Sequence, residues 1–381
     1  MIMTINKNTS HKPRARELGL PFTGVTGPHN AITDVPNVAV GLHSVCEDAP
    51  RAGRPLPVRT GVTTVVPHPQ ADVPVPVFAG VHRFNGNGEM TGTHWIEDGG
   101  YFLGPIAITN THSVGMAHHA TIKWMLERYR STYHGSRPRW IMPVIAETFD
   151  GILNDINALA LTEADVRAAL DNAATGPVAE GNTGGGTSMI AYSFKGGTGT
   201  SSRCLTIADR KYTLGVLVQA NNGQRDWLTV CGVPVGRHMA DIAPGADMTE
   251  RGSIIVIIAT DIPMAPHQLQ RLARRGTMGI GRNGTPGGNN SGDIFLAFST
   301  ANAEPLRDTP PALRSLEMVD NDQFDPIYMA VVDAVEEAVI NAMLAAETIP
   351  GTIDGRPGIE AIPHDRLVKI MRDYSRLEVS A

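Results

Sequence analysis

The stretch DIAPGADMTERGSIIVIIATD, residues 241–261, decides the fold class. Residues 254–259 are apolar at every position, so the strand that they predict is covered on both faces. Such a strand is typical of the centre of a layered α/β architecture. Residues 241–252 are polar and predict a solvent-exposed loop. Ser253 is therefore expected at the mouth of a core strand, directly after this loop.

Strand and helix patterns flank this central strand on both sides. Apolar runs between glycine and proline residues predict strands at 35–41, 61–67, 77–82, 140–146, 187–194, 212–220 and 291–300. Helical spacing and end signals predict helices at 113–130, 162–176, 266–275, 328–346 and 365–374. Thr162 and Asp165 have nearly the spacing of a capping box. With no internal repeat or linker, the expectation is one integrated α/β unit with helices layered over sheet.

Composition favours a globular enzyme. Of 381 residues, 42% are hydrophobic and only 18% charged, which disfavours a disordered or coiled-coil protein. The formal charge of −6 gives no general attraction to nucleic acid or to an anionic membrane. The most basic stretch, Lys12–Arg16, is expected to be a solvated tail.

Cysteine usage and the absence of a signal-like segment set the expected compartment. Three scattered cysteines form neither a disulfide framework nor a Cys-x-x-Cys motif. The first twenty residues have no apolar signal core, and no run of eighteen apolar residues follows. A cytoplasmic protein with no membrane partner is the expectation.

Two patterns invite cofactor hypotheses. Residues 279–284 match G-x-G-x-x-G, but a helix is expected before them and Pro286 prevents one from starting after them, which is the wrong context for a dinucleotide. Thirteen histidines suggest a metal, yet His118 and His119 point about 100° apart on a helix and no H-E-x-x-H motif occurs. Neither a cofactor nor a metal is expected.

Ser253 is a candidate nucleophile without a neighbouring base. No G-x-S-x-G elbow occurs before a helix. If the Gly252–Ser253 bond breaks, the new α-amine, with a pKa of about 8, can take the hydroxyl proton itself. Gly252 suits this cleavage because it has no β-carbon beside the attacked carbonyl. A Gly-Ser pair is also a common end of a turn, and the spacing alone leaves both interpretations open.

Six segments in order carry a resemblance to a known family. They are GPHNAITDVPNVAVG (27–41), PVIAETFDGILNDIN (143–157), GNTGGGTSM (181–189), GVLVQANNG (215–223), RGSIIVIIATD (251–261) and SGDIFLAFST (291–300). Together they resemble the L-aminopeptidase/D-esterase and β-peptidyl aminopeptidase family of self-cleaving amino-terminal-nucleophile hydrolases. The resemblance implies a four-layer αββα sandwich with family-specific connectivity. It also implies cleavage into a large subunit, 1–252, and a small one, 253–381, assembled as a homotetramer of cleaved pairs.

The resemblance also implies a catalytic centre. Ser253 would be the nucleophile, with Ser291 and Asp293 completing the polar centre. On a strand, residues two apart share one face, so Ser291 and Asp293 are expected to point together at the Ser253 amine. Asn221 matches the residue used at the oxyanion hole, with Asn222 as an adjacent competitor.

A second set of residues would recognise the substrate. Glu147 matches the carboxylate that holds the free ammonium group of an aminopeptidase substrate. Phe149 stands where some relatives have tyrosine. Phenylalanine lacks the tyrosine hydroxyl, which puts any catalytic role of a tyrosine at this position in doubt.

The implied function is an aminopeptidase that releases L-α-, D-α- or β-amino acids from short peptides, amides and esters with a free amino terminus. An acyltransferase with the same acyl-enzyme is an alternative, although self-processing acetyltransferases usually expose threonine. A second alternative is a non-enzymatic relative that only binds peptides. This alternative requires decayed catalytic positions, whereas the candidate residues are all chemically competent.

Overall fold

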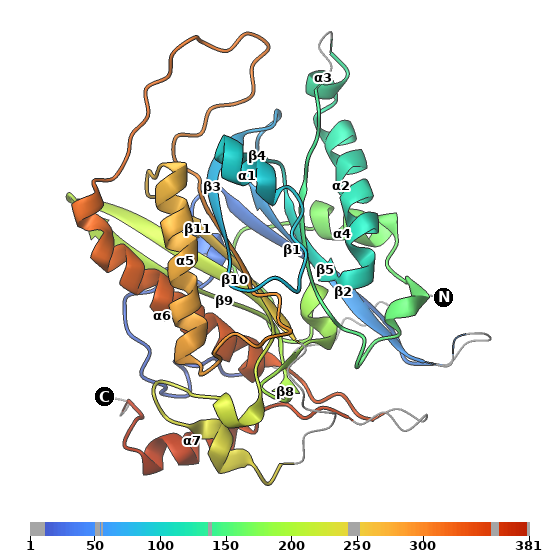
Figure 1. Ribbon diagram of the computed structural model, residues 1–381, viewed down its shortest axis with the longest axis vertical. Coiled ribbons are helices and arrows are strands. Elements are labelled where there is room, and N and C mark those ends of the chain that lie inside the picture. The colour runs from blue at the N-terminus through green and yellow to red at the C-terminus, as the bar shows by residue number, and fades with distance from the viewer. Residues whose placement is uncertain are drawn as a thin grey trace.

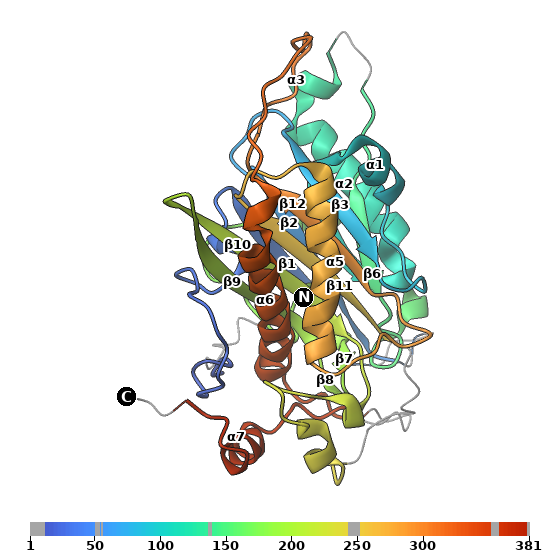
Figure 2. The ribbon, with the colours of Figure 1, turned by 60° about the vertical axis from the view of Figure 1, so that its left-hand side comes forward.

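The computed structural model describes residues 12–49, 54, 56–135, 139–242, 252–351 and 358–378. They form four layers, helix, sheet, sheet and helix, as Figures 1 and 2 show. The predicted αββα sandwich is therefore present. Most of the segment 241–252 lies outside the described residues, so the predicted exposed loop there remains a prediction.

One sheet has the strand order β1-β2-β5-β6. Its strands are β1 (Val38–Glu47), β2 (Val58–Pro67), β5 (Ile106–Asn110) and β6 (Val144–Thr148). The outer face of this sheet packs on α2 (Val114–Arg128) and α4 (Glu163–Asp171) through a cluster that includes Trp124, Ile145 and Val166. The Thr162–Asp165 capping box is confirmed at the start of α4.

The other sheet has the order β4-β3-β12-β11-β10-β9 and contains the central strand. Its strands are β3 (Pro76–Arg83), β4 (Tyr101–Leu103), β9 (Gly197–Ile207), β10 (Arg210–Asn221), β11 (Ser253–Thr260) and β12 (Ile294–Ser299). β11 pairs antiparallel with β10 and parallel with β12. Every residue of β11 is buried, as its apolar run predicts.

Alternate residues of β11 face two different cores. Ile255 and Ile257 lie in the core between the two sheets, while Val256 lies in the core under α5 (Pro266–Arg282) and α6 (Phe324–Ala345). α5 and α6 run side by side over this sheet (Figure 2). The remaining helices are α1 (Thr93–Gly99), α3 (Arg130–Tyr133) and α7 (His364–Asp373).

Away from the candidate site, three of the sequence expectations are wrong. The first is the predicted strand 187–194, which is a short hairpin of β7 (Ile190–Ala191) and β8 (Phe194–Lys195). Tyr192 and Ser193 form its turn at positive φ, a conformation that composition does not reveal. The long strand of this region is instead β9.

The second error concerns the end of the helix expected at 266–275. The helix α5 continues to Arg282 and contains most of the G-x-G-x-x-G pattern. Gly279 lies against α6, where a Cβ atom would be 2.5 Å from Cβ of Val335. Gly279 therefore allows close packing of two helices, and the pattern forms no phosphate loop.

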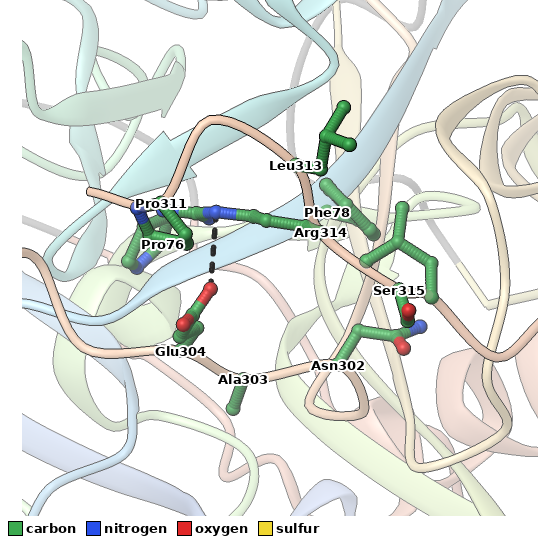
Figure 3. Close-up of a pocket in the computed structure, with 10 residues that line it drawn as sticks. Pro76, Phe78, Asn302, Ala303, Glu304, Pro311, Leu313, Arg314 and Ser315 are labelled. Atoms are coloured by element: carbon green, nitrogen blue, oxygen red, sulfur yellow. Dashed lines mark ion pairs between the residues drawn. The ribbon is translucent and has the colours of Figure 1, made fainter.

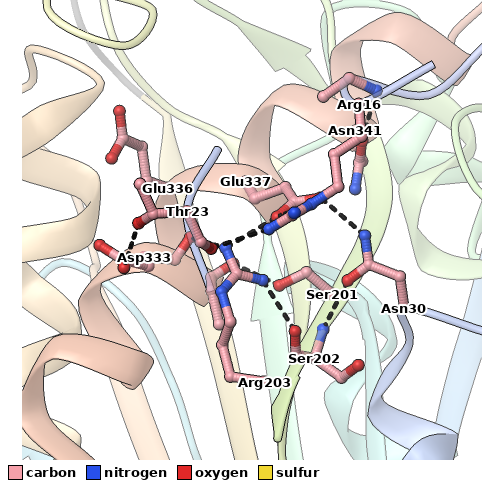
Figure 4. Close-up of polar contacts among 12 residues, drawn as sticks. Arg16, Thr23, Asn30, Ser201, Ser202, Arg203, Asp333, Glu336, Glu337 and Asn341 are labelled. Carbon is pink, nitrogen blue, oxygen red and sulfur yellow. Dashed lines mark hydrogen bonds and ion pairs between the residues drawn. The ribbon is translucent and has the colours of Figure 1, made fainter. Parts of the chain in front are cut away.

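The third error is the solvated tail expected at Lys12–Arg16. Ala15 is fully buried, and Arg14 forms an ion pair with Glu180 at 2.7 Å. Arg16 pairs with Glu337 of α6 at 2.9 Å (Figure 4). The partners are more than 160 residues away in the chain, so a local charge pattern could not reveal them.

Glu337 is the buried centre of this cluster. Its carboxylate is fully buried and also pairs at 2.7 Å with Arg203 of β9, whose side chain is 2% exposed. Asn30 is a third partner and donates a hydrogen bond, at 2.6 Å, to the same carboxylate (Figure 4). The cluster ties residues 16–30 and β9 to α6. It therefore joins chain segments on both sides of Ser253. No described helix combines the length and hydropathy needed to cross a membrane.

We predict that Glu337→Gln destabilises the fold by about 3–5 kcal/mol, because it leaves the buried guanidinium of Arg203 without its counter-charge. Thermal unfolding followed by circular dichroism measures the effect. Glu127→Gln, which removes one partner of an exposed ion pair with Arg167, is the control and should leave the melting temperature unchanged. Equal melting temperatures for both variants would contradict the prediction.

Candidate active site

Ser253 begins the central strand at the end of the sandwich. It pairs with Asn221 across the β10–β11 ladder and is 4% exposed. The backbone N–H of Gly292 donates a hydrogen bond to its Oγ at 3.0 Å. Since side chains alternate along a strand, Ser253 faces the same side as Ile255, toward the space between the sheets.

Gly252 is pressed against the neighbouring strand. A Cβ atom at this position would lie 1.6 Å from the carbonyl oxygen of Asn221. Any side chain here would therefore push the strand start away from β10. The close approach explains why glycine precedes Ser253 independently of any cleavage.

Ser291 and Asp293 lie beside Ser253, although they do not lie on a strand. β12 begins only at Ile294, so the expectation that a strand aligns Ser291 and Asp293 is wrong. The two side chains still meet, because the Ser291 hydroxyl donates to Oδ1 of Asp293 at 2.5 Å. The same oxygen accepts the N–H of Ile254, the residue after Ser253, at 3.2 Å.

Burial and hydrogen bonds act in opposite directions on the pKa of Asp293. Its burial raises the pKa, because the charged form loses water. Hydrogen bonds from Ser291, Asn85 and Ile254 oppose this rise, because they stabilise the ionised carboxylate. Three donors around one buried carboxyl group are the arrangement that an ionised carboxylate needs.

Asn221 uses its side chain to bridge two segments. Its Oδ1 accepts the N–H of Ile190 at 2.7 Å, and its Nδ2 donates to the carbonyl oxygen of Phe149 at 2.9 Å. The adjacent Asn222 is 1% exposed, and neither polar atom of its side chain has a hydrogen-bond partner among the described residues.

Glu147 lies near the end of β6 and is 4% exposed. Oε1 accepts the backbone N–H of Glu89 at 2.9 Å, and Oε2 accepts the hydroxyl of Thr111. Burial is the largest influence on this carboxyl group and raises its pKa. Phe149, two residues further on, is 39% exposed and follows the end of β6 at Thr148.

Two features near these residues were missed at the sequence level. Asp150, which is buried and has a pKa raised to about 6 by desolvation, accepts the hydroxyl of Thr60 at 2.7 Å. The loop 84–90 contacts both Asp293 and Glu147. Its sequence FNGNGEM would ordinarily be interpreted as a turn, and a repeated Asn-Gly pair is too common to indicate a site.

Two cavities of the described residues lie away from the candidate site. One of about 350 Å³ is formed by the start of β3 and the loop after β12, with Glu304 and Arg314 paired at 3.0 Å on its wall (Figure 3). A second, of about 400 Å³, lies between the amino-terminal arm and α6. None of the candidate site residues lines either cavity.

Comparison with known proteins identifies relatives along nearly the whole chain. Residues 30–356 match the model of peptidase family S58. The β-peptidyl aminopeptidase BapA of Sphingosinicella microcystinivorans is 46% identical over 384 residues, covering 96% of this chain and 93% of that protein.

Solved structures agree. The L-aminopeptidase D-Ala-esterase/amidase of Ochrobactrum anthropi, described as a variant of the Ntn hydrolase fold, is 63% identical with a TM-score of 0.93. It covers 96% of this chain and 100% of that one. A β-aminopeptidase of a Burkholderia species is 41% identical with a TM-score of 0.85, over 95% and 99% of the chains. The expected fold class and enzyme class, an aminopeptidase, are thereby confirmed, and the chain belongs to peptidase family S58.

Proposed function

We propose that this protein is a serine aminopeptidase that cleaves its own chain before Ser253 and then uses Ser253 to form an acyl-enzyme. The observation that carries the proposal is the surroundings of the Ser253 hydroxyl. An N–H donor lies at Oγ, and a buried carboxylate is bonded to the N–H of the next residue. Glu147 supplies a separate carboxylate from the facing sheet.

Self-cleavage begins with attack of Ser253 Oγ on the carbonyl carbon of Gly252. The C–N bond breaks, its nitrogen takes a proton, and an ester replaces the amide. Water then hydrolyses the ester, releasing the carboxyl group of Gly252 and the free amine of Ser253. Support comes from the polar centre beside Oγ, where the N–H of Gly292 donates to Oγ and the Ser291 hydroxyl donates to Asp293.

In turnover, the free amine of Ser253 accepts the hydroxyl proton while Oγ attacks the substrate carbonyl. An amine with a pKa of about 8 is roughly one-tenth deprotonated at pH 7 and about half deprotonated at pH 8, so the free base needed for general-base catalysis is present near neutrality. Ser291 and Asp293 orient this amine. The amine or alcohol of the substrate leaves with the proton, and water releases the amino acid from the acyl-enzyme.

The negative charge of the tetrahedral intermediate needs donors. The N–H of Gly292 donates to Ser253 Oγ at 3.0 Å and is proposed as one of these donors. Asn221 retains its proposed oxyanion role. Only its Nδ2 can donate to the intermediate, either with the second N–H of this nitrogen or by giving up the bond to the carbonyl oxygen of Phe149.

Glu147 is proposed to bind the substrate ammonium group, with Phe149 beside it and Asn222 as a further substrate contact. Burial has removed water from this carboxylate and raised its pKa, so a bound cation stabilises its charged form strongly. This requirement for a free amino end makes the enzyme an aminopeptidase. A tetramer of cleaved pairs stays a prediction from the resemblance, and a cytoplasmic location stays a prediction from the composition of the sequence.

Purified wild-type protein should contain two chains, of which the smaller begins at Ser253 and has 129 residues. Ser253→Ala should be a single chain without activity, because it removes the attacking oxygen of both reactions. Intact-protein mass spectrometry combined with an aminoacyl anilide assay measures both. Intact wild-type chains that hydrolyse the anilide would disprove the proposal.

Glu147→Gln should lower kcat/KM for unblocked aminoacyl anilides about 10- to 100-fold, because a charge-assisted contact to the ammonium group is lost. Ionised Glu147 is the binding form, and its pKa is raised. The wild-type KM should therefore rise as pH falls, starting at a higher pH than for an exposed glutamate, and this dependence should vanish in the variant. The exposed Glu97→Gln is the control and should behave as wild type. Equal pH profiles of KM for wild type and Glu147→Gln would sink the assignment.

A panel of anilides of L-alanine, D-alanine, glycine and a β-amino acid tests the substrate class. The 63% identity to the L-aminopeptidase, against 46% to the β-peptidyl enzyme, supports a preference for L-α substrates. The L-alanine anilide should be hydrolysed at least about tenfold faster than the β-amino acid anilide, a difference of about 1.4 kcal/mol in the barrier. Faster turnover of the β-substrate would reverse this assignment.

A further inference from the structure

The loop between β3 and α1, residues 84–90, lies between the proposed nucleophile centre and the proposed ammonium carboxylate. At one end, the N–H of Asn87 donates to the carbonyl oxygen of Ser291 at 3.2 Å. At the other end, the N–H of Glu89 donates to Glu147 at 2.9 Å. Between them, a Cβ atom on Gly88 would be 3.0 Å from Cα of Gly292 and 3.5 Å from Oε1 of Glu147.

Asn85 makes the closest contact of this loop with the polar centre. Its Oδ1 accepts the backbone N–H of Asp293 at 2.5 Å, and its Nδ2 donates to Oδ2 of Asp293 at 3.1 Å. Nδ2 also donates to the carbonyl oxygen of Gly288 at 3.2 Å. One orientation of the amide satisfies all three contacts, because one end must accept and the other must donate.

The two oxygens of Asp293 are thus held by different parts of the chain. Oδ1 takes the bonds from Ser291 and Ile254, while Oδ2 takes the bond from Asn85. Without Asn85, Oδ2 would lose this donor inside a site where the carboxyl group is fully buried. The carboxylate could then rotate away from the start of β11.

We propose that Asn85 is a positioning residue of the active site, which holds Asp293 ionised and correctly oriented while its loop fixes the separation between Glu147 and Ser253. This proposal rests on the proposed function. It adds a residue from the β3–α1 loop to a centre otherwise built from β11 and the segment before β12.

The groups that face Asp293 set the sign of the expected pH effect. They are the Ser291 hydroxyl from its own segment, the Asn85 amide from the loop and the Ile254 N–H from β11. Among the described residues these groups are uncharged, and cleavage adds one titrating neighbour, the amine of Ser253. Removing the Asn85 donor raises the pKa of Asp293. On acidification, the Asp293 carboxylate of the variant is therefore protonated at a higher pH than that of the wild type.

The test compares Asn85→Ala, Asn85→Asp and the control Asn87→Ala with wild type. Asn85→Asp keeps the shape and the acceptor for Asp293 N–H, but it removes the donor and places a second carboxyl group at Asp293. Asn87 is an exposed asparagine of the same loop, and its side chain bonds only the carbonyl oxygen of Asn290 among the recorded contacts. Processing is followed by gel electrophoresis, folding by circular dichroism, and kcat and KM by hydrolysis of L-alanine anilide from pH 5 to 9.

We expect kcat of both Asn85 variants to fall about 10- to 100-fold, with KM within about threefold of wild type. Their acid-side loss of activity should start at a higher pH than in Asn87→Ala, in which the Ser253 amine titrates as in wild type. A folded but uncut Asn85 variant also supports the proposal, because cleavage uses the same centre.

Wild-type kcat in Asn85→Asp would overturn the inference, since shape alone would then suffice. Failure of both Asn85 variants to fold, or equal effects of Asn85→Ala and Asn87→Ala, would also overturn it by assigning the loop a purely structural role. Uncut, inactive wild-type protein would instead refute the proposed function.

Discussion

The buried pairing of β11 with its two neighbours is the constraint on which the rest of the structure depends. A strand that is apolar on both faces needs cover from a second sheet and from helices, which produces the four layers. The same pairing places Ser253 opposite Asn221 and beside the segment that leads into β12. Stability and the position of the candidate nucleophile therefore have one origin.

The polar centre is built where this regular pairing stops. Ser291, Gly292 and Asp293 precede β12. The carbonyl oxygens of Ser291 and Asp293 and the N–H of Asp293 bond to the loop 84–90 instead of to a strand ladder. Release from the ladder frees the Gly292 N–H to bond Ser253 Oγ. Buried carboxylates in this region are stabilised by several short contacts each, as burial of charge requires.

Local patterns predict the helices and strands of the layers well. The candidate site is predicted only from the family resemblance. The apolar run of β11, the spacing of α2 and the capping box of α4 are signals within a few residues, and each appears as expected. The positive-φ turn at Tyr192 and the glycines inside α5 depend on tertiary packing, so a linear pattern assigned them wrongly.

The remaining omissions have the same cause. Asn85 acts on Asp293 from 208 residues away, and Arg16 meets Glu337 from 321 residues away. Neither asparagine in a turn nor arginine in a polar arm carries a local sign of its partner. The strand alignment expected for Ser291 and Asp293 failed although their contact exists, because a direct hydrogen bond replaced the strand geometry.

Trapping the acyl-enzyme tests the central claim most directly. Protein mixed with an L-alanine ester is quenched in acid within one turnover, digested with trypsin and mapped by mass spectrometry. The account predicts an alanyl adduct on the peptide of residues 253–271, whose first residue is Ser253. An adduct confined to a peptide that contains Ser291, or rapid turnover with no adduct on residues 253–271, would contradict it.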